Sequence, residues 1–220
     1  MKTAKTALSV EDMKDLSRLK KNSNVSAKYT DIYYTIDGTH PGLNTNKYTE
    51  PFALPEGGVV KAVAVARPGF DFMEVGDPVT TAEFGIASFD WKVSGTSDIQ
   101  AQKAFDGDEN TFWYSGVKSG ETNKIVIDLG RLVDIAGFSY LPGQDGNLDG
   151  VVEKYEFYVS NDGKEWGNPV EDGRFENIRN NPIRQTVRFD KKQTCRFIRF
   201  ESKANVQGSG ISVSEISVFK

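Results

Sequence analysis

The sequence is poor in the residues on which much catalytic and metal-binding chemistry depends. It contains one histidine and one cysteine, His40 and Cys195. A single cysteine cannot form an internal disulfide, and two such residues cannot supply the three or four ligands of a usual zinc site. A catalytic triad or Cys–His dyad would have to use His40. Because 31 Asp and Glu residues are present, we expect any metal to be a hard cation bound by oxygens and any hydrolysis to be carboxylate chemistry.

Long apolar runs and stretches of one charge are missing as well. No apolar segment approaches the roughly 20 residues of a membrane span, and the first five residues have no apolar signal-peptide core. The 27 Lys and Arg residues are interspersed with the 31 acidic ones, which gives nucleic-acid binding little support. We therefore expect neither a nucleic-acid partner nor a membrane partner. The chain is either cytosolic or a piece of a longer secreted protein.

The sequence does contain two blocks of residues whose patterns are typical of β-strands. Hydrophobic residues make up 38% and aromatic residues 11% of its 220 residues, which is enough to bury a core. Within residues 29–86, β-branched and aromatic runs predict strands at 31–36, 48–54, 59–66 and 80–86. Short strands at this spacing are typical of a small β-sandwich. Residues 1–28 form either a frayed leader or, from a capping-box pattern at Ser9, one short helix.

A second and larger β-rich block runs from residue 87 to 220. It predicts strands at 124–129, 137–140, 155–160, 185–189, 195–201 and 212–219. Two of these alternate, so that Ile125, Ile127 and Leu129 share one face, as do Tyr155, Phe157 and Val159. No segment beyond the leader shows a sustained helical period. The predicted fold class is all-β, with two consecutive antiparallel domains.

Three segments of the first block occur in a recognisable order. They read IYYTIDGT at 32–39, YTEPF at 48–52 and VKAVA at 60–64. They resemble the small immunoglobulin-like domain that follows the catalytic barrel in chitobiases and other β-hexosaminidases. The resemblance implies an immunoglobulin-like domain at 29–86, preceded by a leader or linker at 1–28.

Seven segments of the second block also follow a family order. They lie at 91–93, 104–113, 125–130, 137–142, 154–166, 195–199 and 214–216. They resemble the discoidin, or coagulation factor 5/8 type C, domain, which in bacterial glycosidases is a carbohydrate-binding module of family 32. For residues 87–220 this implies a jelly-roll β-sandwich with ligand loops at one end.

The acidic turn at residues 106–111 is a candidate cation site. Gly107 permits the bend and Asp106 points a carboxylate into it. The resemblance implies a structural calcium ion bound by carbonyl, carboxylate and hydroxyl oxygens. Its implied ligands are Lys103, Asp106, Asp108, Thr111, Ser214 and Glu215. The alternative is an ordinary Asp-Gly turn that binds no metal.

The family's sugar site is altered in this sequence. Where galactose-binding members tend to carry His, Arg and Asn, this chain has Tyr114, Gly143 and Asp149. The bidentate clamp that an Arg provides is therefore absent, and galactose specificity cannot be carried over. The remaining candidates are Tyr114 as a stacking surface and four hydrogen-bonding side chains. These four are Gln144, Asp145, Asn147 and Asp149.

Other conspicuous residues have structural interpretations. Trp91, Trp113 and Trp166 are expected to pack in the core or at its rim, and Cys195 to be a small buried hydrophobic residue rather than a reactive thiol. His40 lies in a Gly-rich turn and is expected to be solvated.

Together these features predict a non-catalytic accessory region at the C-terminus of a bacterial glycoside hydrolase of the chitobiase, β-hexosaminidase or α-L-fucosidase type. Its partners would be glycans with terminal sugars and an upstream catalytic domain in the same chain, outside the cytoplasm. The alternative is a structural or protein-binding spacer that has lost sugar binding. No pair of carboxylates stands out as catalytic, so the region itself is not expected to be an enzyme.

Overall fold

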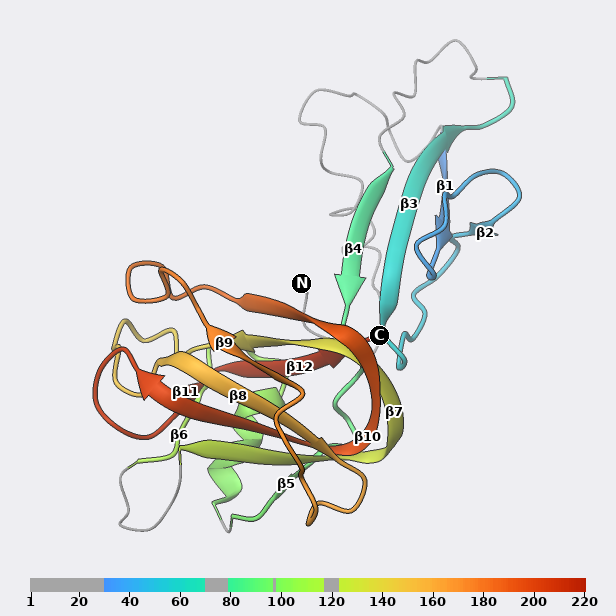
Figure 1. The fold of residues 1–220 in the computed structure, drawn as a ribbon. Coiled ribbons are helices and arrows are strands. Elements are labelled where there is room, and N and C mark those ends of the chain that lie inside the picture. Colours follow the sequence, from blue (N-terminus) through green and yellow to red (C-terminus); the bar gives the residue numbers. More distant parts are fainter. Residues whose placement is uncertain (1–29, 70–78, 97, 117–122) are drawn as a thin grey trace. The chain divides into compact units, whose positions relative to one another are not determined.

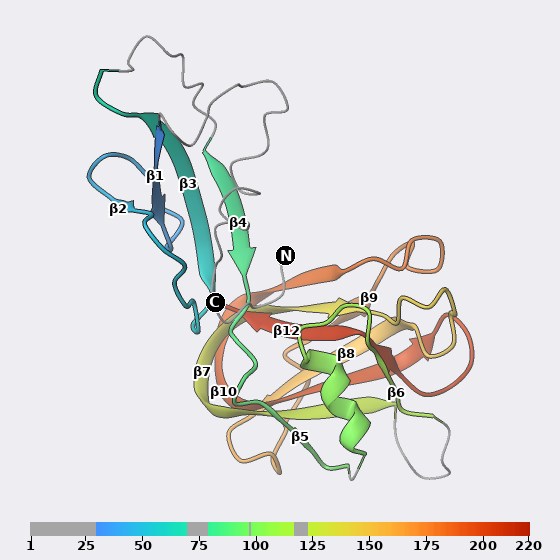
Figure 2. The same ribbon diagram turned by 180° about the vertical axis from the view of Figure 1, so that it is seen from behind.

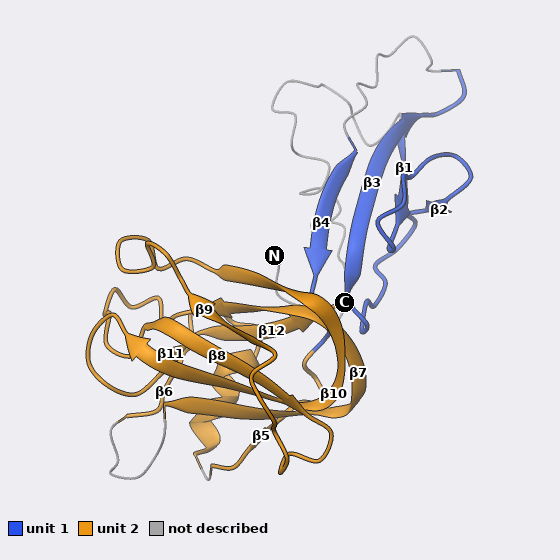
Figure 3. Ribbon diagram, in the orientation of Figure 1, with its two compact units in different colours: residues 1–87 blue, residues 88–220 orange. Residues whose placement is uncertain are grey.

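The computed structural model describes residues 30–69, 79–96, 98–116 and 123–220. The chain divides into two compact units, residues 1–87 and 88–220 (Figure 3). The all-β prediction is confirmed, because a small sheet in the first unit is followed by a larger antiparallel β-sandwich in the second. The helix predicted near Ser9 lies outside the described residues. None of the helical turns within the described ranges is long and apolar enough to cross a membrane.

In the first unit, the described residues form one antiparallel sheet in the order β2-β1-β3-β4 (Figure 1). The strands are β1 (Thr30–Thr35), β2 (Asn46–Lys47), β3 (Gly58–Ala66) and β4 (Thr80–Phe84). Four buried side chains form its core, and Tyr34 and Phe52 stack against them with ring centroids 4.7 Å apart. These four are Leu54, Val60, Ala62 and Phe84. Burial of this apolar face stabilises the small sheet.

The strand predicted at 48–54 is wrong. The chain pairs with β1 earlier, through Asn46 and Lys47, and is irregular over most of 48–54. Pro51 has no N–H to donate to a ladder, which disfavours a strand at its position. The aromatic rings that suggested a strand, those of Tyr48 and Phe52, instead pack against the core of the sheet.

The second unit is built on a sheet in the order β12-β7-β10-β8-β9, with β5 also paired to β7, and on a two-stranded sheet of β6 and β11. A short 3₁₀ helix, η1 (Ile99–Phe105), precedes β6. The strands are β5 (Lys92–Ser94), β6 (Trp113–Tyr114), β7 (Lys124–Leu141), β8 (Val152–Ser160), β9 (Glu171–Arg174), β10 (Gln185–Asn205), β11 (Ser212–Val213) and β12 (Glu215–Phe219).

Two pairs of predicted strands are single long strands. The segments 124–129 and 137–140 both belong to β7, and 185–189 and 195–201 both belong to β10. The two strands pair along their length, with a register shift between Arg188 and Gln193, and they bend together (Figure 2). A bulge bends a strand without ending its ladder.

The predicted strand at 212–219, in contrast, divides at Ser214. Its first part, β11, pairs with β6, whereas its second part, β12, pairs with β7. The chain therefore moves from one sheet to the other at Ser214. The Ser214 N–H donates to the Leu141 carbonyl at 2.8 Å, so the crossing residue remains tied to the larger sheet.

The core of the second unit is aromatic. Phe138 is fully buried and stacks on Phe157 with ring centroids 4.3 Å apart. The predicted alternation is confirmed at Ile125, Ile127, Leu129, Tyr155 and Phe157, which are all buried, whereas Val159 is half-buried. Trp91 and Trp113 are buried as expected, and Trp166 is half-buried at the rim.

Cys195 is fully buried in β10, and burial, together with the charge of Asp134, raises the pKa of its thiol from 9.0 to about 12. Because the thiolate is the reactive form, we expect iodoacetamide at pH 8 to alkylate the native chain about a thousandfold more slowly than the urea-unfolded chain. Mass spectrometry of the time course measures this ratio. Equal rates in the two states would contradict the burial of Cys195.

Candidate binding loops and cation loop

Three segments that are distant in the sequence meet at one end of the second unit, where β6 and β11 lie (Figure 1). We call residues 112–116, 142–150 and 206–212 the loop end. Tyr114 pairs with Ser212 in the β6–β11 ladder. The Gly150 N–H donates to the Gln207 carbonyl at 3.0 Å, and the Ser212 N–H donates to the Gly150 carbonyl at 2.8 Å. These backbone bonds hold the three segments together.

Tyr114 is the most prominent aromatic side chain of the loop end. The residue is 39% exposed, and its hydroxyl donates to the Ser209 carbonyl at 2.6 Å. Added Cβ atoms at Gly150 and Gly210 would lie 2.8 and 3.3 Å from its ring. The two glycines thus let the backbone approach one edge of the ring. A half-exposed ring fixed in this way can present an apolar surface to a ligand.

The four polar candidates lie on the 142–150 segment, and most of their contacts are within it. Gln144 is exposed and donates through Nε2 to the carbonyls of Pro142 and Pro182 at 2.8 and 2.9 Å. Oδ1 of Asp145 accepts from the Asn147 N–H, and Oδ1 of Asn147 accepts from the Asp149 N–H, both at 3.0 Å. Asp149 itself forms a backbone bridge with Gln207. The structure therefore joins Asp149 to the segments around Tyr114, and Gln144 to a further segment at 182.

The backbone at Gly143 lies close to two side chains. An added Cβ would lie 2.5 Å from the Ser212 hydroxyl and 3.2 Å from the Phe112 ring. The Gly143 N–H also donates to that hydroxyl at 3.2 Å. A side chain at this position would require the Ser212 hydroxyl to rotate away and the Phe112 ring to shift slightly.

The predicted cation-site residues are brought together, although they come from opposite ends of the domain. We call residues 106–111 the cation loop. Oδ1 of Asp106 accepts from the Asp108 N–H at 2.9 Å, and its Oδ2 accepts from the Thr111 hydroxyl at 2.7 Å. From β12, Oε1 of Glu215 accepts from the Gly107 N–H at 2.7 Å. The Ser214 hydroxyl donates to the Thr111 carbonyl at 2.7 Å. Lys103 lies in the last turn of η1, which Asp106 caps.

The electrostatics of this region are dominated by a buried carboxylate. Glu215 is 1% exposed, and burial raises its pKa from 4.5 to about 8. The Gly107 N–H and the charge of Arg184 lower this pKa, whereas the charges of Asp106 and Glu109 raise it further. A cation at this place would offset the acidic charge.

The donor chemistry at the cation loop fits a hard cation. Across the described part of the chain, no group of three or more His, Cys, Asp and Glu side chains is placed to hold a metal ion. An ion here would therefore depend on the carboxylates of Asp106 and Glu215 together with carbonyl and hydroxyl oxygens, which calcium accepts. The carbonyl-bearing candidates are Lys103, Asp108, Thr111 and Ser214.

The fold and its clustered loops define a β-sandwich of the discoidin type. The family model for the F5/8 type C domain matches residues 87–216. The chain belongs to the F5/8 type C domain family. A second model, described as Fn3 associated, matches residues 19–71. This match supports an Fn3-associated N-terminal region, and the chitobiase-type immunoglobulin-like domain at 29–86 stays a prediction.

Individual relatives agree with this assignment. A galactose oxidase of Gibberella zeae is 30% identical over 145 residues, which cover 61% of this chain and 20% of that protein. The chain therefore matches about a fifth of the length of this curated relative.

Solved structures show the same fold over the second unit. A family 32 module of a family 89 glycoside hydrolase from Clostridium perfringens, in complex with GalNAc-β-1,3-galactose, is 25% identical with a TM-score of 0.53, covering 62% of this chain and 99% of its own. The family 32 module of NanJ from the same organism, in complex with galactose, is 27% identical with a TM-score of 0.52. The match covers 62% of this chain and 98% of that module. A putative chitobiase fragment from Bacteroides thetaiotaomicron shares the fold at 16% identity and a TM-score of 0.51. The match covers 61% of this chain and 91% of that fragment.

Proposed function

We propose that the F5/8 type C unit binds terminal sugars of glycans and holds a catalytic domain of the same longer protein near its substrate. The observation that carries this proposal is Tyr114, a half-exposed ring fixed by Ser209 and by close backbone at Gly150 and Gly210. The two Clostridium perfringens modules, solved with galactose-containing ligands, support it. Linking a weak binder to a catalytic domain raises the local substrate concentration without any new catalytic group.

The proposed parent protein is a glycoside hydrolase that acts outside the cytoplasm. The sugar would stack on Tyr114 and form hydrogen bonds with polar groups of the 145–149 segment. Because glycine stands at position 143, where the family resemblance implies an arginine, the hydroxyl clamp that an arginine provides is absent from this site. We therefore propose weak binding whose sugar preference differs from that of the two modules above.

We also propose that the cation loop binds one structural calcium ion. Its ligands would be Asp106, Glu215 and Thr111, with the carbonyls of Lys103, Asp108 and Ser214 completing the set. When bound, the ion supplies positive charge that offsets the carboxylates and fixes the loop against β12. It would have no part in chemistry on the glycan.

Tyr114→Ala is expected to weaken glycan binding by roughly tenfold or more, because it removes the stacking surface. A glycan array first identifies the bound terminal sugar, and isothermal titration with that sugar then measures the change. Phe89→Ala is the matched control, because Phe89 is 64% exposed and lies outside the loop end. Failure of the wild-type chain to bind any terminal sugar, or unchanged affinity in Tyr114→Ala, would contradict the proposal.

A second candidate function is that of a structural or protein-binding spacer. It is favoured by Gln144, because the Nε2 group of this side chain already donates to the carbonyls of Pro142 and Pro182. A polar group engaged in this way contributes less to a sugar. An empty glycan array, combined with saturable binding to a purified partner protein, would favour the spacer over the tether.

A further inference from the structure

Arg184 connects the cation loop with the body of the domain. Its Nη2 donates to Oε1 of Glu109 in the cation loop at 2.9 Å, and its Nη1 donates to the Ser139 hydroxyl in β7 at 3.1 Å. Ser139 is fully buried, and its Oγ lies 2.8 Å from Oγ of Ser217 in β12. The Arg184 side chain is 11% exposed, whereas that of Glu109 is 53% exposed. A largely buried guanidinium therefore joins a surface loop to two core strands.

The chain just before Arg184 is tied to the loop end. The Pro182 carbonyl accepts from Nε2 of Gln144 at 2.9 Å, and the Ile183 N–H donates to the Asn181 carbonyl at 2.8 Å. Directly after Arg184, Gln185 begins β10 and pairs with Tyr140. Arg184 thus lies between the start of β10, which is paired with β7, and the Pro182 carbonyl, which binds Gln144.

A second set of contacts links the cation loop with the loop end, through the segment that contains β11 and β12. The Ser214 hydroxyl donates to the Thr111 carbonyl at 2.7 Å. Two residues earlier, the Ser212 hydroxyl accepts from the Gly143 N–H at 3.2 Å, and the Ser212 backbone pairs with Tyr114. The cation loop and the loop end are therefore supported by adjoining residues of one segment.

We propose that Arg184 is a positioning residue that couples the order of the cation loop to the order of the 142–150 segment, so that a cation bound at one stabilises the other. The role of the 142–150 segment in glycan binding and the effect of calcium rest on the function proposed above, whereas the effect of the Arg184 substitutions without added ion does not. Its physical basis is the fork of the guanidinium, which bonds Glu109 and Ser139 at once. Removing the fork takes one ion pair from the Glu109 carboxylate, although the Glu109 carbonyl still accepts from the Ser214 hydroxyl at 3.1 Å. It also leaves the buried Ser139 hydroxyl without its charged donor.

The test is hydrogen exchange with mass spectrometry on the full chain, with no ligand and with added calcium chloride. In Arg184→Gln, amides of both the cation loop and the 142–150 segment are expected to exchange about tenfold faster, while β8 is unchanged. Added calcium is expected to slow exchange in both segments of the wild-type chain, but only in the cation loop of the variant. Arg184→Lys keeps the charge without the fork and is expected to give an intermediate rate.

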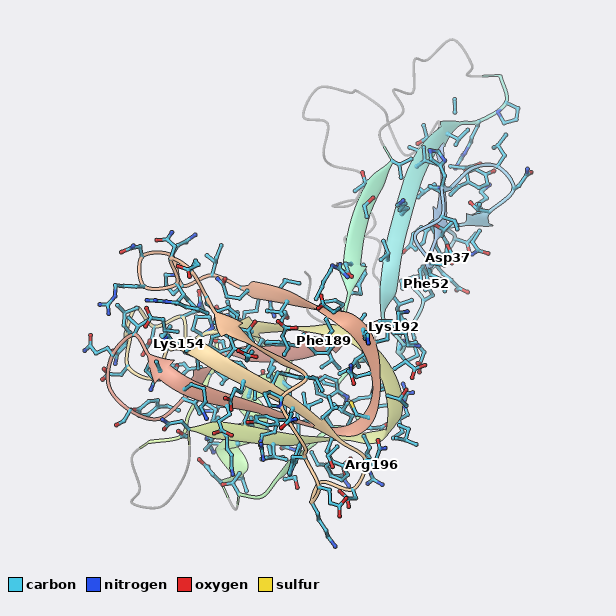
Figure 4. All side chains as sticks on the ribbon, viewed as in Figure 1. Asp37, Phe52, Lys154, Phe189, Lys192 and Arg196 are labelled. Carbon is cyan, nitrogen blue, oxygen red and sulfur yellow. The ribbon has the colours of Figure 1, made fainter. Side chains whose placement is uncertain are left out.

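Arg196→Gln is the matched control. Arg196 also makes two hydrogen bonds through its guanidinium, in this case to both carboxylate oxygens of Asp128 at 2.8 Å. It lies far from β6 and β11 in the view that Figures 1 and 4 share. We expect its removal to leave exchange in the cation loop and the 142–150 segment unchanged.

Two outcomes would overturn the coupling. Faster exchange in the cation loop alone would show that Arg184 does not act on the 142–150 segment. Equal acceleration in every segment, β8 included, would make Arg184 a residue of general stability. If Arg184→Gln does not fold, Arg184→Lys decides between the same outcomes. Absence of glycan binding in the wild-type chain would contradict the proposed function while leaving this exchange result intact.

Discussion

Phe138→Ala is expected to lower the free energy of unfolding of the second unit by about 3–5 kcal/mol, because it removes a large buried ring and leaves a cavity. Phe138 is fully buried. Its ring centroid lies 4.3 Å from that of Phe157, 5.4 Å from that of Tyr155 and 5.7 Å from that of Phe200. These three aromatic side chains, from β8 and β10, would lose contacts together. Urea unfolding of the full chain, followed by circular dichroism, measures the change.

Ile183→Ala is the control for this measurement. Ile183 is 54% exposed, so its truncation is expected to change stability by less than about 0.5 kcal/mol. Phe138→Leu keeps much of the volume and is expected to fall between the two variants. A loss below about 1 kcal/mol in Phe138→Ala would contradict the position of Phe138 at the centre of the core.

The part of the fold that could be predicted from the sequence is the part set by local alternation. Ile125, Ile127 and Leu129 were expected on one face, and all three are buried. The continuity of β7 through Gly130 was not predicted, because this glycine interrupts the alternating pattern and glycine is typical of turns and bulges. What continues the strand is its partner, since Asp134 and Val133 pair with β10 on the far side of the bend. That pairing depends on residues distant in the sequence.

In the candidate site, too, contacts between residues close in the sequence could be predicted, whereas contacts between distant residues could not. Asp106, Asp108 and Thr111 are close in the sequence, so their turn could be predicted from composition and spacing. Arg184 could not, because its ion pair with Glu109 spans 75 residues and no motif surrounds it. The contact between Gln144 and the Pro182 carbonyl, 38 residues away, was missed for the same reason. A family resemblance supplies Ser214 and Glu215, but it does not supply contacts that arise from the packing of this chain.

Removal of calcium is expected to lower the melting temperature of the second unit by roughly 10 °C. Mass action stabilises a domain by about 2.7 kcal/mol when free calcium is a hundred times its dissociation constant, and for a domain of this size each kcal/mol shifts the melting temperature by a few degrees. The physical source is the pair of Asp106 and buried Glu215. Because burial raises the pKa of Glu215 to about 8, its carboxyl is largely protonated at pH 7 without an ion, and a bound ion would stabilise both side chains as carboxylates. Differential scanning calorimetry of the full chain with calcium chloride, and then with excess EDTA, measures the shift.

Asp106→Ala is expected to abolish this calcium dependence rather than merely to lower the melting temperature. The substitution also removes the bonds that Asp106 accepts from the Asp108 N–H and the Thr111 hydroxyl, so a lower melting temperature alone would not indicate an ion. Asp162→Ala separates the two effects, because Asp162 begins another Asp-Gly turn and accepts from the N–H groups of Lys164 and Glu165. This control should lose turn stability and keep the full response to calcium. A wild-type chain that melts at one temperature in calcium and in EDTA would make the loop at 106–111 an ordinary Asp-Gly turn.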